Sequence, residues 1–182
     1  MAAAGKSADQ SGLIETTVTF LQMSARPVLP PIVAPAGRHA LLRVENCPIG
    51  YYRYLYDVVG RDWHWVDRKR LDDKALGAIL ADPKTEIYVL YMDGWPAGYF
   101  ELDLRDHPRR INLSYFGLVK EAIGKGAGRW LLAQAIGMAW DRAPQLFTVN
   151  TCTLDHPTAL PLYQRMGFVV YDRMQAFVDP KV

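Results

Sequence analysis

The sequence has few cysteines, little net charge and no long apolar run. Its two cysteines, Cys47 and Cys152, are too few for a disulfide scaffold and suit a reducing compartment. A formal net charge of +2 is too small to indicate nucleic acid as the main partner. No apolar run approaches the ~20 residues that cross a membrane, and the first residues lack a signal-peptide core. We therefore expect a cytoplasmic protein with neither a nucleic-acid nor a membrane partner.

Metal-ligand spacing is also missing. His64 and His107 have no second ligand at a spacing typical of a metal site. Cys152 falls inside a predicted strand, where a small buried residue is a better interpretation than a nucleophile. We expect no metal cofactor.

What the sequence does contain is enough apolar material for one folded unit. A chain of 182 residues with 50% hydrophobic residues suits a single α/β domain. Residues 1–12 are small and polar and are expected to be disordered. The rest, 13–182, is predicted to form one domain whose stretch 25–48 is a proline-rich lead-in without an assigned role.

The hydrophobic pattern predicts alternating strands and helices. We expect helices over 49–59 and 71–80 and a hairpin of 86–92 and 97–104 around the Asp93-Gly94 turn. Further strands are predicted at 16–23, 111–119 and 146–154, with 40–44 a possible short strand.

A glycine-rich segment lies between a strand-like run and a helix-like run. Residues 124–129 read Gly-Lys-Gly-Ala-Gly-Arg. Glycines let a backbone approach a ligand closely, and the free N–H groups of a helix start attract anions. The lysine followed by serine or threonine of a Walker loop is absent, and the third glycine of a dinucleotide fingerprint would fall at Arg129. A phosphate-bearing cofactor of another kind is the remaining candidate; a turn that merely caps the helix is the alternative.

Two motifs resemble the GNAT family of N-acetyltransferases. The family's pyrophosphate loop, Gln/Arg-x-x-Gly-x-Gly/Ala, matches residues 123–128 except that Ile123 replaces the leading Gln or Arg. The segment 159–168, which follows a β-rich run, resembles the closing motif of the family, with Ala159 and Tyr163 four residues apart and an ending in Gly-Phe. Gly167 suits the left-handed position after a helix, and Phe168 can fold back onto the last turn.

The resemblance implies a fold, a co-substrate and several roles. The expected fold is an α/β (α+β) GNAT fold: a mixed, mostly antiparallel twisted sheet flanked by helices, with acetyl-CoA in the cleft between its fourth and fifth strands. Tyr163 matches the acid that protonates the departing thiolate, and Gly117 is a candidate bulge where the strands diverge. The residues expected to bind acetyl-CoA are Leu118 and Val119 through their backbone, Gly124, Lys125, Gly126, Ala127, Gly128, Arg129 and His156.

A general base and the acceptor contacts are argued from strand register. Where some relatives carry a glutamate, this chain has Asn112, which cannot accept a proton. Alternation puts Glu101 and Asp103 on one face of their strand, near Ser114 and Asn112. Glu101 is therefore the predicted base, with a solvated sheet face as the alternative. The predicted substrate contacts are Asp103, Asn112, Trp63 and Trp65, although the two tryptophans equally suit core packing.

The turn before the second motif has two interpretations. His156 occupies a place where the family often has a cofactor-contacting asparagine, so it can bind the cofactor or shuttle a proton. Alternatively, the turn is structural and Asp155 or Thr158 caps a helix that begins near Thr158.

Together these features predict an enzyme, an acyltransferase that moves an acetyl group from acetyl-CoA to a primary amine. Direct attack by the amine in a ternary complex is the expected mechanism. The acceptor is a small molecule or a peptide amine, and the oligomeric state is not readable. The alternative is a non-catalytic acyl-CoA-binding module or sensor, because Ile123 and Asn112 depart from the stronger patterns.

Overall fold

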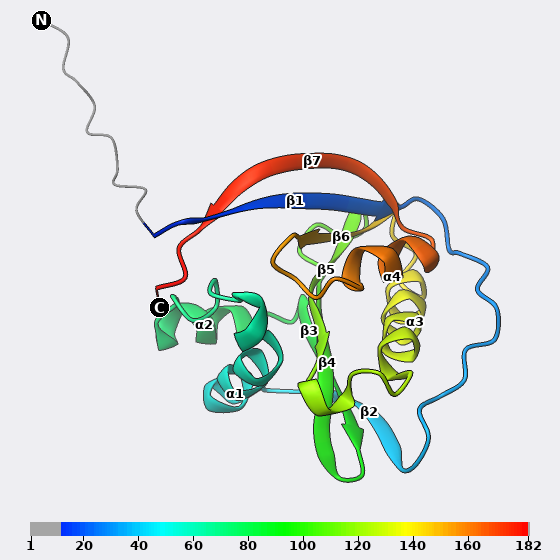
Figure 1. Ribbon diagram of the computed structural model, residues 1–182. Helices are drawn as coiled ribbons and strands as arrows, with labels where there is room; N and C mark the ends of the chain where they lie inside the picture. The colour runs from blue at the N-terminus through cyan, green and yellow to red at the C-terminus, as the bar shows by residue number, and fades with distance from the viewer. Residues whose placement is uncertain (1–11, 182) are drawn as a thin grey trace, which may run out of the picture.

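A seven-stranded sheet in the order β2-β3-β4-β5-β6-β1-β7 runs through the molecule. The computed structural model describes residues 12–181 (Figure 1). The expected disorder of residues 1–12 therefore lies, Gly12 apart, outside the described residues. Five of the six strand pairs are antiparallel and one, β5–β6, is parallel, as expected for a mixed, mostly antiparallel sheet. The strands are β1 (Ile14–Met23), β2 (His39–Val44), β3 (Thr85–Met92), β4 (Trp95–Asp103), β5 (Arg110–Leu118), β6 (Leu146–Cys152) and β7 (Val169–Val178).

Helices flank this sheet. The helices α1 (Ile49–Gly60) and α2 (Asp73–Leu80) lie on one side, and α3 (Ala127–Trp140) and α4 (Ala159–Arg165) lie on the other (Figure 1). Two short 3₁₀ turns, η1 (Arg61–Trp63) and η2 (Lys120–Ala122), follow α1 and β5. Both early helices agree with the predicted ranges; α2 begins later because the Asp72 carboxylate caps it, accepting the Ala75 N–H at 2.7 Å. No helix within residues 12–181 is long and apolar enough to cross a membrane.

Both faces of β4 are covered, which the alternating pattern did not reveal. Residues 97 to 102 of this strand are all buried, and Glu101 is 1% exposed. The alternative of a solvated sheet face at Glu101 is therefore wrong. The physical reason is that β4 lies inside the sheet and has α1 and α3 packed against it, so residues on either face lose contact with water.

The first strand lies far from its sequence neighbours. β1 fits between β6 and β7, and the following stretch 24–38 runs around the outside of the molecule to β2 at the opposite edge (Figure 1). β1 pairs with β7 along Ile14–Gln22 but with β6 only along Val18–Met23. The free ends of β1 and β7 therefore extend past β6 as a two-stranded ribbon, here called the β1–β7 ribbon.

The sheet opens between β5 and β6. These strands pair only from Arg110 to Leu113 on β5, opposite Leu146 to Val149 on β6. Because the short run His39–Val44 forms a strand, the diverging strands are the fifth and sixth of the chain rather than the fourth and fifth.

A bulge lies just where this opening begins. Tyr115 pairs with Glu101 and Leu113 with Leu102, which leaves Ser114 as the extra residue of β5. The bulge is thus at Ser114 and not at Gly117. Gly117 serves a different need: a Cβ there would lie 2.5 Å from Cγ1 of Val59, so only glycine lets α1 pack this closely.

Candidate functional site

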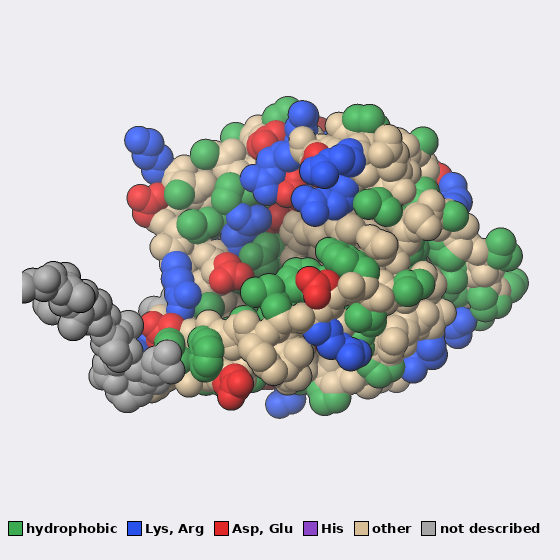
Figure 2. Space-filling view, turned by 90° about the horizontal axis from the view of Figure 1, so that it is seen from above, with side chains coloured by type: hydrophobic (Ala, Val, Ile, Leu, Met, Phe, Trp, Pro, Cys, Tyr) green, Lys and Arg blue, Asp and Glu red, His purple; other side chains and the backbone are tan. Residues whose placement is uncertain are grey.

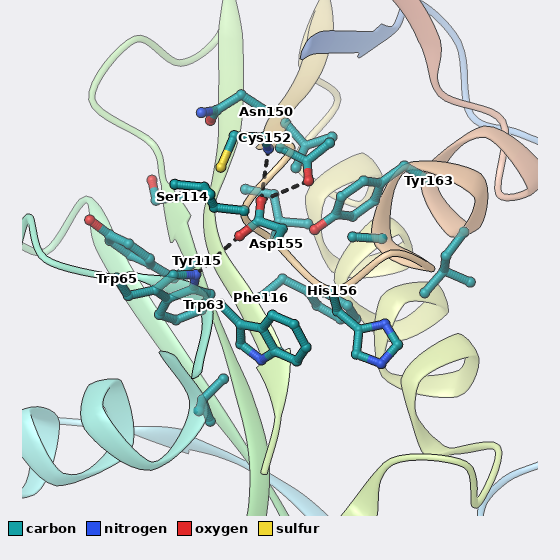
Figure 3. A pocket seen from close by; sticks show the side chains of 18 of the residues that line it. Trp63, Trp65, Ser114, Tyr115, Phe116, Asn150, Cys152, Asp155, His156 and Tyr163 are labelled. Atoms are coloured by element: carbon teal, nitrogen blue, oxygen red, sulfur yellow. Dashed lines mark hydrogen bonds between the residues drawn. The ribbon is translucent and has the colours of Figure 1, made fainter. Parts of the chain in front are cut away.

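A pocket of about 830 Å³ occupies the opening between β5 and β6. One end is formed by the loop before α3, and the other by the loop after α1, the β4–β5 turn and the β1–β7 ribbon. Figure 3 shows the part where Trp65, Asp155 and Tyr163 meet. The pocket therefore has a glycine-loop end and an aromatic end.

The glycine loop has the geometry of an anion cradle. Gly124 and Gly126 adopt φ values of 82° and 79°, a region that favours glycine. A Cβ at either position would meet no atom within 4 Å, so the space above the loop is open. Gly126 precedes the first residue of α3 and no side chain caps that helix, which leaves its first N–H groups available. These features fit a diphosphate.

Not every predicted loop residue reaches the pocket. Gly124, Gly126, Gly128 and Arg129 line it, whereas Lys125 is exposed outside the lining and Ala127 is buried beneath it.

The edge of β5 forms one wall. Past Leu113 this strand keeps β4 on one side but has no strand partner on the other, so its backbone is open to an extended ligand. Leu118 lines the pocket. Val119 does not: its N–H donates to the Ala97 carbonyl at 2.9 Å and is unavailable to a ligand.

Tyr163 lies on the opposite wall, on α4. Its ring packs edge-on against Phe116 and Phe168, and the side chain is 5% exposed. Burial, and then the negative charge of Asp155, hold the pKa of Tyr163 well above its ordinary value, so the phenol keeps its proton. Gly167 is left-handed with φ 100°, and Phe168 donates its N–H to the Tyr163 carbonyl at 3.1 Å, as the motif predicted.

His156 lines the pocket in the turn before α4. Its Nδ1 accepts the Thr158 N–H at 3.2 Å, and its ring meets the Trp63 ring edge-on at 5.0 Å. Helix α4 begins directly after Thr158, as expected, but no side chain caps it. Neither proposed capping residue therefore acts as a cap.

The aromatic end brings together the predicted substrate contacts. Trp63 and Trp65 both line the pocket, and the Trp65 ring lies 5.2 Å from that of Tyr115. Asp103 pairs with Asn112 across β4 and β5, and both face the pocket. Burial opposes ionisation of Asp103, but hydrogen bonds from Arg105 outweigh it and hold its pKa below the ordinary value.

Glu101 is not brought into the pocket. Its Oε2 accepts the Tyr52 hydroxyl proton at 2.6 Å, and its Oε1 accepts from Nη2 of Arg68 at 2.6 Å. It is Arg68 that lines the pocket, with its guanidinium 5.2 Å from the centre of the Tyr115 ring. Both carboxylate oxygens of Glu101 are therefore engaged away from a substrate.

The residue that sequence reasoning missed is Asp155, for which the sequence predicts only a capping role. It lies in the turn after β6, and its Oδ2 accepts from the Thr151 hydroxyl at 2.7 Å and the Cys152 N–H at 2.9 Å. Its Oδ1 accepts from Nε1 of Trp65 at 3.3 Å. Figure 3 shows its carboxylate between Trp65 and Tyr163. The available signal was an acid directly after the last buried strand and before the Tyr163 helix.

Several ion pairs lie at and beside the pocket. Figure 2 shows Lys and Arg side chains gathered beside a hollow, with Asp and Glu side chains among them. At the β4–β5 turn, Arg105 pairs with Asp103, and Arg109 and Arg110 pair with Asp106. Within residues 12–181, no group of three or more potential ligands is placed to hold a metal ion.

Comparison with known proteins gives one family match. Residues 63–178 match the family model described as acetyltransferase (GNAT) domain. No curated protein matches the chain.

Solved structures share the fold at low sequence identity. A functionally unknown conserved protein from Staphylococcus epidermidis is 16% identical with a TM-score of 0.60, covering 95% of this chain and 65% of its own. A GCN5-related N-acetyltransferase from Sphaerobacter thermophilus is 17% identical with a TM-score of 0.58, covering 95% of this chain and 55% of its own. The chain thus spans less than the full length of both.

An aminoglycoside acetyltransferase from an uncultured soil metagenomic sample, solved with trehalose, is 11% identical. Its TM-score is 0.58, and the match covers 71% of this chain and 87% of that one.

Proposed function

Because the chain belongs to the GNAT acetyltransferase family, we propose that it is an acetyl-CoA-dependent N-acetyltransferase that acts on a primary amine. One observation carries the proposal: the open glycine loop before α3 and the protonated Tyr163 line the same pocket, where β5 and β6 diverge. A phosphate site and a proton donor on one cleft are what acyl transfer from a CoA thioester requires.

The two walls would hold the co-substrate in an extended form. The N–H groups around Gly124, Gly126 and Gly128 would bind the pyrophosphate, with Arg129 adding positive charge. The open edge of β5 up to Leu118 would bind the pantetheine arm. Bound acetyl-CoA would supply an activated acyl thioester.

Other residues in and beside the pocket would donate a proton, contact the acceptor and position the aromatic wall. Tyr163 would donate its proton to the departing sulfur, since its raised pKa keeps the hydroxyl protonated at neutral pH. Trp63, Trp65, Asp103 and Asn112 would contact the acceptor. Glu101, with both oxygens engaged, would act as a positioning residue that holds Arg68 against Tyr115.

The test is amine-dependent release of CoA. A panel should include an alkylamine, a diamine, an amino acid and a lysine-containing peptide, each assayed with wild-type protein and Tyr163→Phe. We expect release with at least one amine and a roughly 100-fold lower kcat in the variant, the low end for a lost general acid. Tyr171→Phe, which removes the hydroxyl of a half-exposed tyrosine on β7, is the matched control.

The pH profile adds a second criterion. Because the folded-state pKa of Tyr163 is raised above 10.0, the acid stays competent as the pH rises, and kcat should not fall between about pH 7 and 10. Binding of acetyl-CoA without turnover of any amine would instead favour the non-catalytic binding module.

A further inference from the structure

Among the described residues that line the pocket, Asp155 is the one carboxylate that is both anchored and open. Its Oδ2 is held by the Thr151 hydroxyl and the Cys152 N–H, which fix the side chain to the end of β6. Within residues 12–181 its Oδ1 has a single donor, Nε1 of Trp65, at 3.3 Å. A carboxylate oxygen has two lone pairs, so Oδ1 can accept a further hydrogen bond from a ligand.

The other acids near the aromatic end differ in this respect. Glu101 lies outside the lining, with Tyr52 and Arg68 on its two oxygens. Asp103 is ion-paired with Arg105. Within residues 12–181 no Lys or Arg forms an ion pair with Asp155, so its charge is not neutralised by the protein.

Asp155 lies between the two walls of the cleft, with Trp65 on one side and Tyr163 on the other. Through Trp65 it contacts the aromatic wall, where Trp65 packs on Tyr115. On the other side, the Tyr163 hydroxyl points toward it (Figure 3). The negative charge of Asp155 is one cause of the raised pKa of Tyr163. An ionised carboxylate beside a protonated phenol is an arrangement in which one group can accept a proton while the other donates one.

We propose that Asp155 binds the acceptor ammonium through Oδ1 and accepts its proton, so that it is a catalytic residue. This assignment rests on the proposed function. The aromatic rings of Trp63 and Trp65 line the same end of the pocket and suit an approaching cation.

Asp155 and Tyr163 together account for every proton that moves in the reaction. Oδ1 of Asp155 takes one proton from the ammonium, and the neutral amine forms the C–N bond to the acetyl carbon. The Tyr163 hydroxyl gives its proton to the sulfur as the C–S bond breaks. The proton that leaves the new amide nitrogen returns to Tyr163, and Asp155 releases its proton to solvent. An ammonium and a thioester thus become an amide, a thiol and one proton.

The decisive variant is Asp155→Asn, assayed with amines of different basicity. At pH 7, acceptors that are protonated in solution should lose roughly 100-fold or more in kcat/KM. An acceptor of low pKa, already neutral at that pH, should lose less than about tenfold, because it needs no base. When the pH is raised above the pKa of a basic acceptor, the difference in kcat/KM between Asp155→Asn and wild type should likewise become smaller.

Controls separate chemistry from structure. Asp67→Asn removes an exposed carboxylate from the same pocket and should change kcat/KM less than about threefold. Thermal stabilisation by acetyl-CoA should be unchanged in Asp155→Asn if only the acceptor step is affected.

Two results would overturn the assignment. If Asp155→Asn loses the same factor in kcat/KM with protonated and neutral amines at every pH, the role of Asp155 is structural. If Asp155→Asn is fully active, Asp155 has no role in the reaction. If wild-type protein binds acetyl-CoA but acetylates no amine, the proposed function itself fails and the assignment falls with it.

Discussion

The two ends of the pocket are built in different ways. The glycine-loop end comes from one continuous stretch, from Leu118 on β5 to Arg129 on α3. The aromatic end draws on the loop after α1, the β4–β5 turn, the turn after β6 and the β1–β7 ribbon, including Thr16 and Val18 at the start of the chain. An end formed by adjacent residues can be read from a motif, whereas an end assembled from distant segments depends on how the sheet closes.

The largest effect at the aromatic end is expected from its buried ion pair. Glu101→Gln would leave the Arg68 guanidinium, 14% exposed, without its carboxylate. Breaking a buried pair in this way costs roughly 3–5 kcal/mol of unfolding free energy. For a chain of this size, that corresponds to a melting temperature lower by roughly 6–20 °C. Calorimetry of wild type and variant measures the change.

Asp103→Asn is the matched control for Glu101→Gln. It breaks the pair with Arg105, which is 59% exposed, and such pairs contribute about 1 kcal/mol or less. If Glu101→Gln melts within about 2 °C of wild type, the Glu101–Arg68 pair does not stabilise the aromatic end. The claim that this end depends on contacts between distant segments would then be wrong.

A smaller effect should follow from narrowing the ribbon wall. Ala176 of β7 pairs with Thr16 of β1, and both face the pocket. Ala176→Phe places a ring in the acceptor space, so KM for bulky amines should rise about tenfold, a penalty of about 1.4 kcal/mol. The dissociation constant of acetyl-CoA should stay the same, because the ribbon lies at the other end of the pocket.

The neighbouring residue provides the control for this wall. Gln175 points to the opposite face of the ribbon, where it accepts a hydrogen bond from the Thr17 hydroxyl at 3.0 Å. Gln175→Phe should leave both the KM for bulky amines and the dissociation constant of acetyl-CoA near the wild-type values. Weaker acetyl-CoA binding in Ala176→Phe would show that the two ends are not separate.

Sequence reasoning succeeded where the backbone itself dictates the residue. The left-handed Gly167, the hairpin turn at Asp93-Gly94 and the start of α4 after Thr158 are local requirements, and all are present. Tyr163 was indicated instead by the resemblance to the family's closing motif, and its catalytic role stays a prediction.

It failed where neighbours come from elsewhere in the chain. Alternation along β4 describes two faces but does not say that helices cover both, so the burial of Glu101 was missed. The period of β1 fits any strand and does not specify pairing with β6 and β7. The contact between Asp155 and Trp65, which lies 90 positions earlier in the chain, depends on the tertiary fold and could not be predicted from the sequence around Asp155.

The most direct test of the central claim is thermal unfolding with and without acetyl-CoA. At about 100 times its dissociation constant, a ligand stabilises the fold by roughly 2.7 kcal/mol, which is a rise of roughly 5–11 °C here. Gly126→Glu should lose this rise, because it puts a side chain and a negative charge into the open cradle. Gly94→Glu, at a left-handed turn with φ 92° and equally open space, should keep it. A folded wild-type protein with no rise at saturating acetyl-CoA would contradict the proposed function.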